Sequence, residues 1–224
     1  MNPVSAQSGT PEPAPPYGDQ ASVPRAARTA DLPSVAAASR PSNPATAGVI
    51  PRYGEPPIVD VGLSVEQAYA AIPHRRTVWV ESDSTVPAKE KAYLKVMFQV
   101  VDQAVAVRVA GVQNFSKQRF DSADIDGEFD RLISFARTMR VPARLALYHN
   151  DILQALSNDR RFFEEWELQR ERFAFARQAA NHPAVRAAAG ALQAAYGELM
   201  SEYPDESQTN KKAFFDYHYA LDFL

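Results

Sequence analysis

Proline is distributed very unevenly along this chain of 224 residues, and its distribution limits where a folded core can form. Residues 1–57 hold 12 of the 17 prolines and none of the 12 phenylalanines or 2 tryptophans. A segment so rich in proline, alanine and serine buries too little apolar surface to offset the entropy lost on ordering. We therefore expect a disordered arm over residues 1–57 and one folded domain over residues 58–224.

Charge and cysteine content exclude several classes of protein. The net charge is −3, so the surface is not basic enough for a general nucleic-acid coat. With no cysteine, neither disulfides nor cysteine-ligated zinc can form. No apolar run reaches the ~18 residues of a membrane helix. The first residues do not read as a signal peptide. We expect a cytoplasmic protein, with secretion by a non-classical route open, and the preference for Arg over Lys suggests a bacterial gene.

Apolar residues in the domain recur at helical spacing, which predicts an all-α antiparallel bundle of six or seven helices. Residues 77–80 are β-prone but isolated, so we expect an extended connector there. The helices are expected from Ser64 to before Pro73, Pro87 to about Asn114, Ile125 to Met139, Pro142 to Leu156, after Asn158 to Ala176, Pro183 to Tyr203, and Thr209 to Leu224.

The motifs that carry familiar chemistry are missing from the sequence. It contains neither of the standard glycine-rich phosphate loops nor the Gly-x-Ser-x-Gly elbow. It also lacks the Glu-x-x-His of di-iron bundles and the His-Glu-x-x-His of zinc proteases. We therefore expect no metal and no cofactor, and we regard an enzyme as the less favoured interpretation.

A few polar residues on apolar helix faces are the candidate site residues. Arg108 is either an anion clamp or an arginine at the bundle edge that extends to water. His149 is either a general base or a core histidine. His218, with Asp222 one turn later, forms either a catalytic dyad or an ordinary helical pair among aromatic residues. Trp166 is a second candidate for ligand binding.

Two basic stretches have alternative interpretations. The run Arg160–Arg177 mixes arginines and aromatic residues, but its glutamates neutralise it, which favours a solvated helix face over nucleic-acid binding. His74-Arg75-Arg76 either binds an anion or ends the first helix, and cations near a helix C-terminus favour the second interpretation.

Two stretches resemble known classes of protein. Val141–Leu156, VPARLALYHNDILQAL, resembles a pattern of small bacterial helical domains, often extracytoplasmic: a helix led by Pro, with Leu, then His, then Leu. That resemblance implies an antiparallel bundle and no activity. Residues 1–57 are similar in composition to the unfolded leaders of type III secreted effectors, which implies an export role.

Three functions follow from these observations. The leading hypothesis is a non-enzymatic binding module, tethered by its arm, that docks a protein partner or a second copy through an apolar helical face. The second is a secreted bacterial protein with an unfolded export leader. The third is a helical enzyme or small-ligand binder, in which Arg108, His149 and His218 converge on one pocket.

Overall fold

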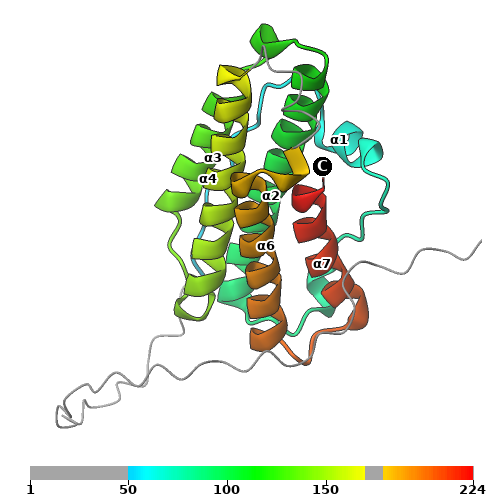
Figure 1. Cartoon of the computed structure of the whole chain (residues 1–224). Coiled ribbons are helices and arrows are strands. Elements are labelled where there is room, and N and C mark those ends of the chain that lie inside the picture. The colour runs from blue at the N-terminus through cyan, green and yellow to red at the C-terminus, as the bar shows by residue number, and fades with distance from the viewer. Residues whose placement is uncertain (1–49, 170–178, 224) are drawn as a thin grey trace, which may run out of the picture. The chain divides into compact units, whose positions relative to one another are not determined.

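The computed structural model describes residues 50–169 and 179–223, and this part of the chain is all-α, as the sequence predicts. The disordered arm is predicted over residues 1–57, of which residues 1–49 lie outside these ranges. For residues 50–57 the prediction is wrong, because these residues are described and Tyr53 packs on the bundle. The division into two domains stays a prediction. The described residues contain no β-strand. Their α-helices, which pack side by side (Figure 1), are α1 (Val65–Ala71), α2 (Ala88–Ser116), α3 (Ile125–Thr138), α4 (Ala146–Leu168), α6 (Pro183–Glu202) and α7 (Gln208–Asp222).

Helix α2 lies at the centre of the bundle, because it is apolar around most of its circumference. It contacts α1, α3, α4 and α7, while α6 packs on α4 and α7. Its 29 residues begin after Pro87, as the sequence predicts. At Gly111 the backbone of α2 meets a ring of α4: a Cβ at this position would lie 2.6 Å from the Phe163 ring. Only glycine therefore lets α2 and α4 come this close.

Local signals account for most helix ends. The Ser64 hydroxyl accepts the Gln67 N–H, and the Gln67 side chain accepts the Ser64 N–H, which is the predicted capping box. Pro183 stands in the first turn of α6. Residues 77–80 form the predicted extended connector, and the Asn210 side chain pairs with both the N–H and the carbonyl of Val80. An amide of α7 thus replaces the strand partner that this connector lacks.

The predicted break between two helices at Asn158 is wrong. A single helix, α4, runs from Ala146 to Leu168. Asn158 continues it, because its side-chain amide donates to the Gln154 carbonyl oxygen within the same helix. Asp159 also stays helical, since its carboxylate is buried against Arg108. The predicted continuation to Ala176 lies outside the described residues.

A strap, residues 50–61, runs in extended conformation over α2 and α3 before α1 begins. The Tyr53 hydroxyl donates to the Arg140 carbonyl oxygen at 2.7 Å. The Val59 N–H donates to the side chain of Gln103 in α2 at 3.0 Å. Val59 is also buried. The strap is therefore packed against the bundle by both hydrogen bonds and apolar contact.

Candidate functional site

Arg108 is held inside the bundle by a carboxylate of the protein itself. Its side chain is 1% exposed, and one guanidinium nitrogen donates to Asp159, which is fully buried in α4. The other terminal nitrogen donates to the carbonyl oxygen of Asp222 at 3.3 Å. Burial raises the pKa of Asp159 to about 6, and the nearby guanidinium opposes that rise. Arg108 thus ties α2, α4 and the end of α7 together and does not extend to water.

His149 pairs with a tyrosine rather than with a carboxylate. The Tyr93 hydroxyl and His149 Nδ1 share a hydrogen bond of 2.8 Å. His149 is 7% exposed, and burial lowers its pKa, which keeps the ring neutral at pH 7. The Tyr93 ring also meets Tyr53 of the strap edge-on, at 5.8 Å between ring centres. This histidine therefore takes part in the contact between α2, α4 and the strap.

His218 is bonded to its own helix and not to Asp222. Its Nδ1 donates to the Phe214 carbonyl oxygen one turn earlier, and the ring faces Tyr148 at 5.8 Å between ring centres. His218 is 3% exposed, and burial lowers its pKa to about 4. The hydrogen bond of the proposed dyad is replaced by one that any buried helical histidine can make.

The predicted polar constellation is not assembled in one place. His149 precedes Asp159, the partner of Arg108, by ten residues of α4, or about 15 Å along the helix axis. Arg108, His149 and His218 each have a different hydrogen-bond partner. Arg108 and His149 therefore bind at different levels of α4, and the three side chains share no hydrogen-bond partner.

Trp166 belongs to a packed cluster of rings between α2 and α4. It is 5% exposed. Its ring centre lies 5.6 Å from that of Phe115 and 5.4 Å from that of Phe162. Rings at this separation contribute about 0.5–1.5 kcal/mol per pair beyond the burial of their area. The cluster accounts for the position of Trp166 without a ligand.

The His74-Arg75-Arg76 stretch is anchored by two carboxylates that the sequence reading did not identify. His74 Nε2 lies 2.7 Å from Asp216 in α7, and Arg76 pairs with Asp102 in α2 at 2.6 Å. The Arg76 guanidinium also lies over the Tyr69 ring, 4.3 Å from its centre. These contacts fasten the connector to α2 and α7, and they leave His74 and Arg76 less suited to bind an anion.

Aromatic side chains line the outward side of α7. Phe215, Tyr219 and Phe223 follow one another at intervals of four residues, and each is partly exposed. The rings of Phe215 and Tyr219 stack at 5.5 Å. Tyr196 of α6 meets Phe215 at 5.8 Å, and His74 meets Tyr219 at 4.8 Å. The result is a continuous row of rings beside α6.

A stripe of small residues runs along another exposed side of α6, where Arg186 and Gln193 are exposed as well. The small residues recur at intervals of three and four, which places them on one stripe of the helix. Four of the five are exposed, and the first is partly exposed. We call this stripe and the row of rings together the α6–α7 face. The members of the stripe are Ala187, Gly190, Ala194, Gly197 and Ser201.

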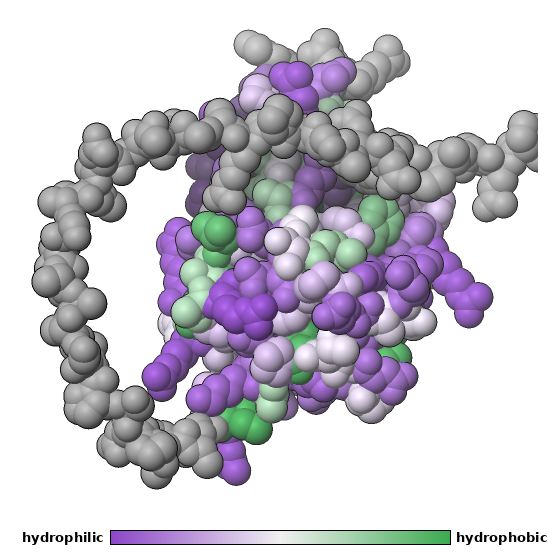
Figure 2. Space-filling view, turned by 90° about the horizontal axis from the view of Figure 1, so that it is seen from below, coloured by the Kyte–Doolittle hydropathy of each residue, from purple (hydrophilic) through white to green (hydrophobic). Residues whose placement is uncertain are grey.

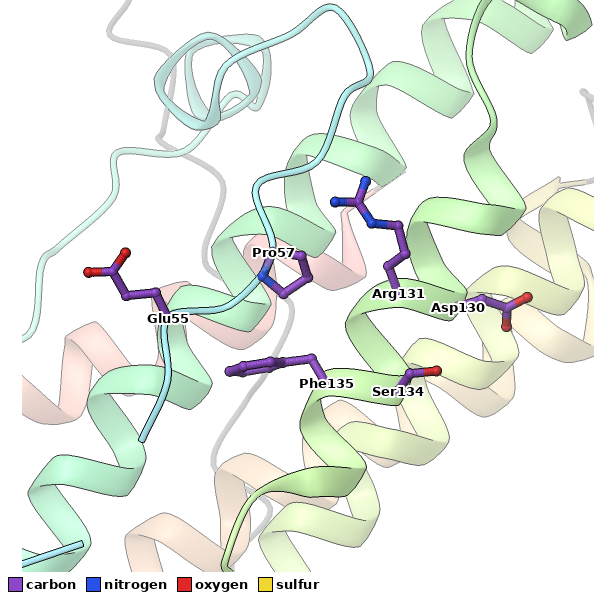
Figure 3. A pocket seen from close by; sticks show the side chains of 6 residues that line it. All are labelled: Glu55, Pro57, Asp130, Arg131, Ser134 and Phe135. Atoms are coloured by element: carbon purple, nitrogen blue, oxygen red, sulfur yellow. The ribbon is translucent and has the colours of Figure 1, made fainter. Parts of the chain in front are cut away.

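Three of the cavities among the described residues lie along the strap. The largest of these three, about 520 Å³, opens between Glu55 and Pro57 of the strap and Arg131, Ser134 and Phe135 of α3 (Figure 3). Cavities of about 360 and 260 Å³ lie beside Tyr53 and Arg140. None of the three is lined by the side chains that the sequence singled out as site candidates.

Comparisons with family models, with curated proteins and with solved structures found no significant match. Within residues 50–169 and 179–223, no helix is both long and apolar enough to cross a membrane. Over the same ranges, no cluster of three or more His, Asp or Glu side chains is arranged to hold a metal ion. The function therefore has to be argued from the surfaces of the molecule.

Proposed function

We propose that this chain is a non-enzymatic interaction module, and that it pairs with a second copy of itself through the α6–α7 face. The observation that carries the proposal is the row of partly exposed rings on α7. Phe215 and Tyr219 of α7 and Phe223 just after it are all partly exposed, although Phe223 also packs against the core. Aromatic residues gathered on a surface are typical of protein interfaces.

The small residues of α6 favour a second copy as the occupant. Rings that project from α7 of one copy would fit over the flat stripe around Gly190 and Gly197 of the other copy. A twofold axis would repeat this contact, because each copy carries both the row and the stripe. By contrast, on the end of the bundle seen in Figure 2, hydrophobic residues are scattered among hydrophilic ones, which is ordinary for any surface.

The hydrogen-bond partners of the predicted polar residues also favour a binding module. Arg108 and His149 join helices through partners within the chain, and His218 is bonded to a carbonyl of its own helix. Residues 1–49 lie outside the described part of the chain, so the tethering and export roles suggested by the sequence remain predictions.

Sedimentation velocity of Tyr219→Ala tests the proposal. This substitution removes the central ring of the aromatic row. We therefore expect the dissociation constant of the dimer to be at least tenfold larger than that of the unaltered chain. Central aromatic residues of interfaces commonly contribute about 2 kcal/mol or more, which exceeds a factor of ten.

Leu147→Ala is the matched control, because Leu147 is an apolar residue of α4 that is 59% exposed and lies outside the face. It should leave self-association unchanged. Equal effects of Tyr219→Ala and Leu147→Ala, or no effect of either, would contradict the assignment of the α6–α7 face.

A further inference from the structure

The two smaller cavities along the strap are bordered by three cations and by no acidic side chain. Lys89 and Arg140 line the cavity of about 260 Å³, and Arg52 and Arg140 line the cavity of about 360 Å³. Pro51 and Tyr53 line both cavities as well, so the two adjoin each other at the strap. We call them together the basic hollow. Each is close to the ~300 Å³ of the smallest ligand pockets in proteins.

The three cations have no partner among the described residues. Arg52, Lys89 and Arg140 are exposed, and none of their charged groups forms an ion pair or a hydrogen bond with residues 50–169 or 179–223. Lys89 also stands in the first turn of α2, where the helix dipole disfavours a cation. The acidic residue of that turn, Glu90, is engaged elsewhere, since it accepts from the Tyr203 hydroxyl at 2.7 Å. The helix itself therefore does not account for the position of Lys89.

The largest cavity along the strap shows, by contrast, a cation that the chain neutralises itself. Arg131 lines it together with Glu55 and Asp130 (Figure 3). Arg131 also pairs with Glu128 of its own helix at 2.8 Å. The cavity in Figure 3 therefore has charges of both signs, whereas the basic hollow has positive charge only, which attracts an anion.

The cations of the basic hollow belong to three segments that are fixed to one another. Lys89 belongs to α2, Arg140 follows α3, and Arg52 belongs to the strap. The Tyr53 hydroxyl fastens the strap by donating to the Arg140 carbonyl oxygen at 2.7 Å, and the Tyr53 ring meets the Tyr93 ring of α2. Burial raises the pKa of Tyr53 and the Arg140 guanidinium opposes that rise, so this positive charge lies near the hydroxyl. The fold thus gathers the three charges before any ligand binds.

We propose that the basic hollow binds a small anion with two acidic groups, which are phosphates or carboxylates. One acidic group is held between Lys89 and Arg140 in the smaller cavity, and the other between Arg52 and Arg140 in the larger. Arginine suits this role, because its guanidinium forms two parallel hydrogen bonds with a carboxylate or a phosphate. No residue of α6 or α7 lines the basic hollow, so this inference is independent of the proposed self-association.

Calorimetric titration of the full chain at low salt, with pyrophosphate and separately with succinate, tests the proposal. We expect a single binding site for at least one of these probes, and the tighter probe identifies the acidic groups as phosphate or carboxylate. The matching probe with one acidic group, orthophosphate or acetate, should bind at least tenfold more weakly. No binding of either two-group probe at millimolar concentration, or equal binding of its one-group counterpart, would overturn the proposal.

Two arginine variants locate the binding. Arg140→Gln removes the cation that borders both cavities, so it should weaken binding about tenfold or more. Arg137→Gln is the matched control, because Arg137 is an exposed arginine in the last turn of α3 that lines neither cavity. It removes the same charge and should leave the affinity nearly unchanged. Equal losses in the two variants would show diffuse attraction to surface charge and would overturn the site.

Amide NMR signals locate the anion without any substitution. Addition of the probe that binds should shift the signals of residues 52–54 and 139–141 more than those of the rest of the bundle. Largest shifts in α6 or α7 would overturn the assignment to the basic hollow, and they would leave the sedimentation test of the α6–α7 face unaffected.

Discussion

The glycine of α2 and the glycines of α6 stand in different settings. Gly111 of α2 faces the Phe163 ring of α4, and a Cβ at that position would lie 2.6 Å from it. At Gly190 and Gly197 of α6, an added Cβ would have no atom of another described segment within 4 Å. Yet glycine inside a helix is about 0.5–1 kcal/mol less favourable than alanine.

The packing of the fold requires glycine at position 111 but does not explain the glycines at positions 190 and 197. The contact between α2 and α4 is sufficient reason for Gly111. Nothing in the described part of the bundle requires glycine at 190 or 197, and both are exposed members of the stripe on α6. The interior therefore accounts for its own unusual residue, whereas the described residues do not account for the two glycines of the α6–α7 face, where we propose that a second copy packs.

The largest expected effect tests the interior, through the buried ion pair. Asp159→Leu leaves Arg108 as a buried cation without its carboxylate, so we expect the free energy of unfolding to fall by about 3–5 kcal/mol. Urea denaturation measures this loss. Replacing both partners, in Arg108→Met with Asp159→Leu, should recover most of it. A single variant as stable as the unaltered chain would show that the pair does not hold α2 and α4 together.

The next effect in size concerns the pH dependence of stability. The pKa of His218 is about 4 in the folded chain, below the ~6.5 of an exposed histidine. The unfolded chain therefore binds a proton first as the pH falls, and the His218 contribution to stability, complete above pH 6.5, decreases by about 3 kcal/mol down to pH 4.

Comparison with His218→Phe isolates that contribution. Burial raises the pKa values of Asp102 and Asp159 to about 6, which has the opposite sign, but these groups are common to both proteins and cancel. Denaturation at several pH values should show a shallower loss of stability in acid for His218→Phe. Parallel pH profiles would mean that His218 does not remain neutral in the core.

The smallest effects test the two glycine settings directly, because the same substitution should act in opposite directions. Gly111→Ala forces a methyl group against Phe163, so we expect a loss of about 1–3 kcal/mol. Gly190→Ala with Gly197→Ala should stabilise the helix of an isolated copy by about 0.5–1 kcal/mol at each site. The same pair should weaken self-association if two helices meet closely there. Denaturation of dilute protein measures the stability of an isolated copy, and sedimentation of concentrated protein measures self-association.

The sequence was sufficient for those features that depend on neighbouring residues. The capping box at Ser64 and the start at Pro183 are local, and α1 and α6 begin where the sequence predicts. The continuity of α4 through Asp159 was missed, because it depends on Arg108, 51 residues earlier. The pairing of His74 with Asp216 spans 142 residues and left no local signal.

The sequence predicts the outward face of α6 only in part. The spacing of small residues from Ala187 to Ser201 is visible in it, but spacing alone does not show which side of α6 faces the core. Exposure in the folded chain supplies that information.

The central claim, that the α6–α7 face pairs two copies, is tested most directly by the mass of the unaltered full chain in solution. Sedimentation equilibrium over a wide range of concentrations should give twice the 24.7 kDa of one chain at the upper end, with dissociation on dilution. A mass of 24.7 kDa at every concentration would contradict the claim and leave Gly190 and Gly197 without an explanation.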